Sequence, residues 1–291
     1  MSGTNNCYIC SATDFSERPG SVRDDERLKI YECNNCGLVF LSSFEHINDS
    51  YYESSSMHDH TTQDIQNWLN ITKWDNERRF DFLKPLLINN TLLDFGCGPG
   101  GFLRLASEIA TVTHGLELEK KLKPHFKKQN LTVFQNLSEL FKELPSEGYG
   151  IITLFQVLEH LPDPKKTLNE LYEVLADDGQ IIIEIPNAND VLLSLYNSKS
   201  FSNFTYWSSH LFLYTSGTLE LLIKQTKFKV NYIKQIQRYS LSNHLYWLSN
   251  GLPGGHEVWS FLNSEDLHLS YEKQLASIGM CDTIVASISK L

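Results

Sequence analysis

Basic residues are scarce in this sequence relative to acidic ones. Its 291 residues include 25 Lys and Arg against 35 Asp and Glu, which gives a formal net charge of −10 at pH 7. Affinity for a phosphate backbone comes largely from clustered Lys and Arg. The lysine-rich stretch at residues 120–128 is interpreted as the solvated face of a helix. We therefore expect no nucleic-acid partner.

Long hydrophobic runs are missing as well. Apolar runs such as Ile181-Ile182-Ile183 are interrupted within a few residues by a charge, here Glu184. The first six residues lack the charged start and apolar core of a secretory leader. No internal repeat is visible, and the overall composition is that of an ordinary globular chain. These absences predict a soluble, cytoplasmic protein with no membrane insertion.

The cysteines, by contrast, are arranged in a pattern. Four of the six form two Cys-x-x-Cys pairs near the amino terminus, separated by 22 residues. Four thiolates at such a spacing can close a tetrahedral shell around one Zn²⁺. Two disulfides are the alternative, which the missing secretory leader disfavours. We predict a closed, structural zinc site with the ligands Cys7, Cys10, Cys33 and Cys36.

From residue 91 onward, short buried-strand patterns alternate with helical ones. Strands are expected at 91–95, 112–116, 131–134, 150–155 and 180–185, and further strands at 228–237 and 282–289. This order predicts an α/β fold with a doubly wound, mostly parallel seven-stranded sheet. We divide the chain into a zinc knuckle (1–45), a connector with a lid helix (46–90) and a main domain (91–291) with a substrate-lid insertion at about 238–280.

The first of these strands continues into a glycine-rich loop, residues 94–101. The first, second and fourth of its glycines fit a dinucleotide fingerprint, while the first three fit the nucleoside loop of a methyltransferase. In either case Glu117, about twenty positions later, is placed to accept ribose hydroxyls. Asp94, just before the first glycine, disfavours a pyrophosphate and favours S-adenosylmethionine. The glycines are Gly96, Gly98, Gly100 and Gly101.

Three segments together resemble the motifs of the class I S-adenosylmethionine-dependent methyltransferases. They are Leu92-Leu93-Asp94-Phe95-Gly96-Cys97-Gly98-Pro99-Gly100, Gly115-Leu116-Glu117 and Gln156-Val157-Leu158-Glu159-His160-Leu161-Pro162-Asp163-Pro164. The resemblance covers residues 91–190. With the four-cysteine knuckle, the whole chain resembles a bacterial subgroup associated with modified sugars, surface polysaccharides and natural products.

This resemblance assigns roles to residues around the cofactor. It implies that Gly96, Gly98 and Gly100 lie beside the methionine and ribose, with Asp94 at the edge, and that Glu117 holds the ribose hydroxyls. It further implies that Asn136 and Leu137 contact the adenine and that Gln156 begins the loop under the sulfonium. From the residues alone, Asn136 is equally well explained as a turn residue.

The methyl group on a sulfonium is already activated, so the protein need only align a nucleophile and manage one proton, and no metal is required. The base is expected near the carboxyl ends of the strands, where His160 and His210 are the candidates. Each has an alternative. His160 can cap a helix or bond to a loop carbonyl, and His210 can be a packing residue.

Residues 238–259 combine aromatic, histidine and Pro-Gly-Gly elements, which favours a substrate lid over the sheet end. The alternative is a packed helix that stops near Pro253. The side chains predicted to contact substrate, here and elsewhere in the chain, are Tyr51, Tyr206, Arg238, His244 and His256.

The predicted reaction is methylation of a small metabolite. Similar sugar C-methyltransferases carry a Tyr-x-Glu-His grouping where this chain has Trp207-Ser208-Ser209-His210, so only the histidine is matched. Because one imidazole suffices for a hydroxyl, we favour O-methylation of a sugar or sugar nucleotide over C- or N-methylation. An RNA methyltransferase and a non-catalytic S-adenosylmethionine-binding protein are the more distant alternatives, and a homodimer is left open.

Overall fold

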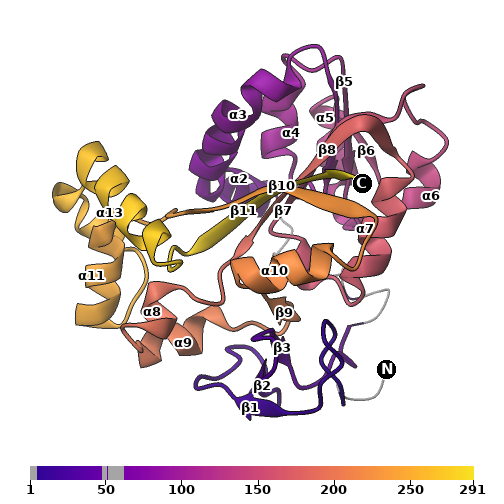
Figure 1. The fold of residues 1–291 in the computed structure, drawn as a ribbon. Helices are drawn as coiled ribbons and strands as arrows, with labels where there is room; N and C mark the ends of the chain where they lie inside the picture. The colour runs from indigo at the N-terminus through magenta and orange to yellow at the C-terminus, as the bar shows by residue number, and fades with distance from the viewer. Residues whose placement is uncertain (1–4, 48–50, 52–61) are drawn as a thin grey trace.

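The computed structural model describes residues 5–47, 51 and 62–291, and a seven-stranded sheet forms its centre (Figure 1). Each neighbouring pair is parallel except those that involve β11, which runs antiparallel to both of its neighbours. The predicted doubly wound, mostly parallel fold is confirmed. In sheet order the strands are β10 (Phe228–Ile236), β11 (Thr283–Lys290), β8 (Leu175–Pro186), β7 (Tyr149–Phe155), β4 (Thr91–Phe95), β5 (Val112–Leu116) and β6 (Thr132–Phe134).

Side-chain alternation along the central strands divides the core between the two faces of the sheet. Successive residues of a strand point to opposite faces, and accordingly Leu92 and Leu93, both fully buried, belong to different apolar clusters. On one face the sheet packs against α3 (Lys73–Leu87) and α4 (Gly101–Ala106), and on the other against α7 (Pro164–Tyr172) and α10 (Ser216–Ile223) (Figure 1). Because these helices cover the two faces of the sheet, the carboxyl ends of the parallel strands lead into loops.

Shorter helices complete the main body. Part of the predicted connector, residues 48–50 and 52–61, lies outside the described residues. The region between it and β4 forms two helices where the sequence predicts one lid helix. The additional helices are α2 (Thr62–Ile71), α5 (Lys123–Lys128), α6 (Leu137–Leu140), α8 (Val191–Ser194) and α9 (Lys199–Thr205), with 3-10 turns η1 (Lys120–Leu122) and η2 (Leu158–His160).

The amino-terminal module forms a second, small sheet that the main domain completes. Its strands β1 (Phe15–Glu17), β2 (Ile30–Cys33) and β3 (Val39–Leu41) are antiparallel, and β3 also pairs with β9 (Phe212–Leu213) from the main domain. Apolar residues of both parts form one continuous cluster. The amino-terminal module therefore packs against the main domain and shares its hydrophobic core.

The predicted insertion lies between β10 and β11 and projects from one end of the sheet (Figure 1). It contains α11 (Leu241–Asn250), α12 (Gly255–Val258), the 3-10 turn η3 (Ser260–Leu262) and α13 (Glu265–Ser277). Gly251, with φ 67°, ends α11 in the left-handed conformation that glycine adopts without strain. Within the described part of the chain, no helix combines the length and apolar character needed to span a membrane.

Candidate functional site

A cavity of about 840 Å³ lies at the carboxyl ends of β4, β5 and β7. Its walls come from the glycine loop after β4, from residues 116–119 after β5 and from residues 155–157 after β7. Side chains of α2 and α3 also line it. Open α/β sheets bind ligands at this edge of the sheet. The volume is in the range of small-molecule sites.

The glycine loop is shaped for close approach of a ligand. Gly96 has φ 76°, and a Cβ there would lie 2.5 Å from Cγ2 of Val157. Gly98 has φ 52°, with Trp68 of α2 3.0 Å from the corresponding position. A side chain at either glycine would both strain the backbone and fill the space beside the cavity wall.

Glu117 follows β5 and turns its carboxylate onto the glycine loop. Oε2 accepts the Gly98 N–H at 2.9 Å, and Oε1 accepts the Glu119 N–H at 3.0 Å. Burial raises the pKa of Glu117, and these backbone donors oppose the shift. A carboxylate oxygen has more than one lone-pair site, so this fixed group can still accept hydroxyl hydrogen bonds from a ligand in the cavity.

Asp94 and Gln156 lie at the cavity end of neighbouring strands. Burial raises the pKa of Asp94 to about 6, while the Thr153 hydroxyl donates to its Oδ1 at 2.7 Å. Gln156 holds a positive φ of 58°, and its Nε2 is buried with no hydrogen-bond partner among the residues described. A strained backbone and an unsatisfied amide, both on the cavity wall, are typical of a ligand-binding position.

Asn136 and Leu137 also line the cavity. The Asn136 side chain accepts the Glu139 N–H at 2.9 Å and caps α6. Asn136 is therefore a helix cap as well as a wall residue, and its contact with the adenine stays a prediction.

The loop that carries His210 is held by the amino-terminal module. Asp24 accepts both the backbone N–H (2.9 Å) and the hydroxyl (2.6 Å) of Ser208, whose carbonyl lies 2.7 Å from Nε2 of His46. The same loop continues into β9 and so into the small sheet. This arrangement fixes His210 relative to the cavity.

His160 and His210 meet at the cavity wall, with ring centroids 4.9 Å apart. Trp207 packs edge-on against both rings. Desolvation lowers the pKa of His160 to about 4 and that of His210 well below its usual value, so both imidazoles are neutral at pH 7. The neighbouring Glu159 is fully buried, and desolvation raises its pKa to about 8.

Sequence reasoning missed the charged side chains that α3 contributes. Asp75 and Arg79 line the cavity. Arg79 forms an ion pair with Glu184 at 2.6 Å, and Arg238 forms a bidentate ion pair with Asp75. Burial alone would raise the pKa of Asp75, but the guanidinium groups around it, Arg238 first, hold it well below its ordinary range. The i, i+4 spacing of Asp75 and Arg79 indicates that both lie on one face of a helix, but it does not indicate that this face meets the cavity.

Of the five predicted substrate contacts, Arg238 is the one found among the described residues that line the cavity. Tyr206 is 2% exposed, and its backbone and ring contact the amino-terminal module. His244 is also 2% exposed, and its ring bonds to Gln237 and Tyr271 inside the insertion. The remaining two side chains bond elsewhere, Tyr51 to Ser208 and His256 to Asn243.

The alternative interpretation of the insertion, a packed helix, thus describes α11. His244 and Trp247 are buried in it, and the chain leaves the helix before Pro253. Burial removes His244 and Tyr206 from direct contact with a ligand in this cavity.

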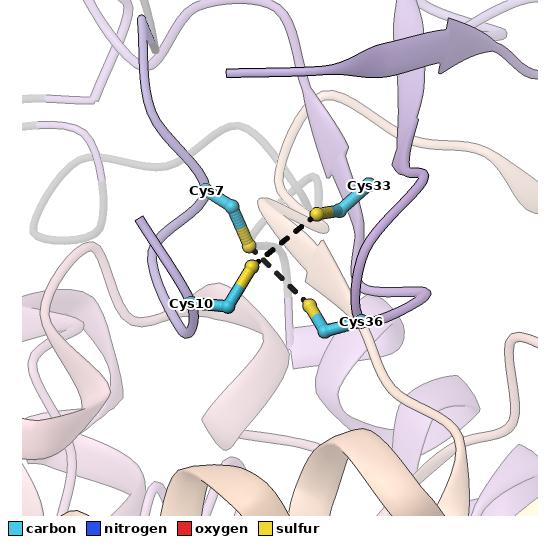
Figure 2. A group of neighbouring side chains, drawn as sticks. All are labelled: Cys7, Cys10, Cys33 and Cys36. Carbon is cyan, nitrogen blue, oxygen red and sulfur yellow. Dashed lines mark hydrogen bonds between the residues drawn. The ribbon is translucent and has the colours of Figure 1, made fainter. Parts of the chain in front are cut away.

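The four amino-terminal cysteines converge on one point (Figure 2). All four are free thiols, with Sγ–Sγ distances of 3.5 Å between Cys7 and Cys36 and between Cys10 and Cys33. Disulfide sulfurs lie only about 2 Å apart, whereas Zn–S bonds of about 2.3 Å place tetrahedral ligands roughly 3.8 Å apart. The thiol arrangement fits a zinc ion and does not fit two disulfides.

Known proteins share this domain. Residues 64–233 match a family described as a methyltransferase domain. A ubiquinone biosynthesis O-methyltransferase from Shewanella sp. (strain ANA-3) is 25% identical over 138 residues, which cover 40% of this chain and 58% of that protein. A ubiquinone biosynthesis O-methyltransferase from Hydrogenovibrio crunogenus is 26% identical over 155 residues, which cover 46% of this chain and 60% of that protein. The chain spans less than two thirds of the length of these relatives.

Solved structures show the same fold. A methyltransferase from Thermotoga maritima, described as a possible histamine N-methyltransferase, superposes with a TM-score of 0.50 and 17% identity, covering 78% of this chain and 94% of that chain. The plantazolicin methyltransferase, solved with S-adenosylhomocysteine, superposes with a TM-score of 0.51 and 16% identity. The superposition covers 83% of this chain and 94% of that chain. Because the family match spans more than half of the chain and the fold agrees, the protein belongs to the class I S-adenosylmethionine-dependent methyltransferases.

Proposed function

We propose that the protein transfers the methyl group of S-adenosylmethionine to a hydroxyl oxygen of a small, sugar-like metabolite. The observation that carries this proposal is that the glycine loop with Glu117 and the imidazoles of His160 and His210 line one cavity. The first group suits the cofactor, and the second suits a reacting hydroxyl. The names of the curated relatives, which are O-methyltransferases, support oxygen as the acceptor atom.

Cofactor binding would use the residues around the loop. Glu117 would accept hydrogen bonds from the ribose hydroxyls, Asn136 and Leu137 would contact the adenine, and the Gln156 amide would face the methionine end. Asp94 would lie at the edge of the loop. S-Adenosylmethionine supplies a methyl group on a positively charged sulfur, which an aligned oxygen can accept directly.

The other end of the cavity would receive the acceptor and handle its proton. Both imidazoles there are neutral at pH 7, and a neutral imidazole carries one nitrogen lone pair that can accept a proton. His210 is the one proposed to receive the hydroxyl proton. Asp24 and His46 both bond to Ser208, and these contacts would hold His210 at a fixed position relative to the methyl group. Fixed alignment of this kind is a large part of the rate enhancement of a two-substrate reaction.

The proposed class of acceptor rests on the mix of side chains along the cavity wall. Asp75, Arg79 and Arg238 line the cavity in ion pairs, and the aromatic rings of Phe155 and Trp207 line it as well. A sugar-like molecule could form hydrogen bonds with the ion-paired groups and pack a ring face against the aromatic side chains. The net charge of −10 argues against an RNA substrate.

The amino-terminal module has a structural role in this proposal. Cys7, Cys10, Cys33 and Cys36 would hold one Zn²⁺ in a closed tetrahedral shell, which leaves no position for substrate. The ion would stabilise the small sheet that includes β9.

The test is turnover by the purified full chain with S-adenosylmethionine and separate panels of sugars and sugar nucleotides, catechols, amines and RNA transcripts. We expect S-adenosylhomocysteine and a mass increase of one methylene with the sugar panel, and NMR should place the new methyl on oxygen. Methylation confined to another panel, or on carbon or nitrogen, would replace the proposed reaction. Tight cofactor binding without turnover in any panel would indicate a non-catalytic binding protein.

A further inference from the structure

Three potential metal ligands meet at the histidine pair on the cavity wall. Glu159 and His160 come from η2 and His210 from the loop before β9, and their ligand atoms all lie within 4.8 Å of one another. Both histidines line the cavity. This group is distinct from the four amino-terminal cysteines.

Glu159 has an unusual environment for a carboxyl group. Its side chain is fully buried, and neither oxygen has a hydrogen-bond partner in the part of the chain that the structure describes. The charged groups packed around it are committed elsewhere: Arg79 pairs with Glu184, and Arg238 pairs with Asp75. Buried carboxylates that lack both a hydrogen bond and a counter-ion are costly. Among the described residues, Glu159 is thus a buried acid without a hydrogen-bond partner, and a cation bound beside it would stabilise its carboxylate form.

The orientation of the imidazoles is consistent with a shared ion. The Nδ1 atom of His160 lies 2.8 Å from the Ser209 carbonyl oxygen, which can only accept, so Nδ1 carries the proton and Nε2 carries the lone pair. That Nε2 lies on the side of Glu159, 4.0 Å from Oε1. In His210, Nδ1 is buried without a hydrogen-bond partner among the described residues. A carbonyl that orients a ligating histidine is the usual supporting contact in metal sites.

We propose that Glu159, His160 and His210 bind a divalent transition-metal ion at the acceptor end of the cofactor cavity. Two imidazoles and one carboxylate form a donor set used by zinc, iron and related ions. Metal–ligand bonds of about 2.1 Å require the three side chains to move slightly inward from their present separation. Because His160 and His210 line the cavity, an ion held by them would be within reach of an acceptor molecule there.

The role of the ion rests on the proposed function. With the ion bound, the two imidazoles would hold the metal instead of taking the acceptor's proton. The acceptor hydroxyl would then lose its proton to solvent more readily, because the metal stabilises the alkoxide. The alkoxide oxygen then forms its bond to the methyl carbon as the carbon–sulfur bond breaks, and S-adenosylhomocysteine leaves as a neutral thioether. Metal binding itself does not depend on this step.

Co²⁺ added to the purified full chain tests the site, because its spectrum separates ligand types. We expect one added equivalent to bind without the sulfur-to-metal charge-transfer bands of thiolate ligation, and proton NMR should show two exchangeable, paramagnetically shifted imidazole N–H signals. Glu159→Gln and His210→Ala should each weaken Co²⁺ binding at least tenfold. His268→Ala, on α13 outside the cavity lining, is the matched control and should bind Co²⁺ like the parent.

Failure to bind Co²⁺ outside the cysteine site, or binding that persists unchanged in both variants, would overturn the proposal. The two imidazole signals are measured on the parent protein, so they decide the matter even if a variant misfolds. Turnover measured on the same samples separates the two proposals. Co²⁺ binding without any methylated product would leave the metal site standing alone, and turnover without such a site would leave only the methyltransferase.

Discussion

Replacing Glu117 by alanine tests the cofactor end of the cavity most directly. Because Gly98 and Glu119 already fix the carboxylate through their backbone N–H groups, it needs little reorganisation to accept ribose hydroxyls. Hydrogen bonds to a charged acceptor contribute about 1.5–3 kcal/mol each and are not additive. Glu117→Ala should therefore raise the dissociation constant of S-adenosylmethionine roughly 10- to 150-fold.

Isothermal titration calorimetry of the parent, Glu117→Ala and Glu117→Gln would measure this. Glutamine keeps one acceptor oxygen, so its affinity should fall between the other two. Glu108→Ala is the matched control, since that side chain is 63% exposed and pairs with Arg104 on the surface. An alanine variant that binds S-adenosylmethionine as tightly as the parent would refute the assignment of Glu117, and tight binding of NAD would refute the cofactor itself.

Three further predictions concern other parts of the molecule. His210→Ala should leave S-adenosylmethionine affinity nearly unchanged in calorimetry but lower kcat by roughly 10²–10⁴-fold, and a normal kcat would exclude it from the chemistry. Asp75→Asn should lower the free energy of unfolding by about 3–5 kcal/mol in urea titrations at pH 7, because Arg238 loses its buried partner. The pKa of Asp75 is depressed in the fold, so this difference should shrink as the pH falls below about 4; a pH-independent difference would contradict the ion pair. Cys36→Ser should remove one zinc per chain by elemental analysis while S-adenosylmethionine still binds, and parent protein without zinc would exclude the metal site.

The sheet was predictable because its signals are local. Each buried strand is a short apolar run, and the alternation of strands with helices admits few topologies. The antiparallel placement of β11 is not encoded in such runs, since parallel and antiparallel strands share the same local pattern. The pairing of β3 with β9 could not be predicted either, because β9 consists of two residues, Phe212 and Leu213, which are too few to form a strand pattern.

The candidate site was likewise predictable only where its signals are local. The glycine loop and Glu117 were found because their spacing along the chain is fixed by the strand that each one follows. Asp75 and Arg79 were missed because nothing in the sequence tells which face of α3 meets the cavity. His244 was misplaced because a histidine in an aromatic helix has the same local pattern whether it is exposed on a lid or buried against Tyr271.

The pairing of β3 with β9 has a consequence for the order of events during synthesis. Val39 and Phe40 pair with Leu213 and Phe212, which leave the ribosome more than 170 residues later. At a synthesis rate of about 5–20 residues per second, the small sheet lacks its last strand for roughly 10–30 s. During that interval β4 to β8 are made, so the nascent amino terminus must keep its cysteines reduced and its apolar strand edge protected until the chain returns to it. Early capture of zinc by the four thiols would protect this segment while it is unfinished.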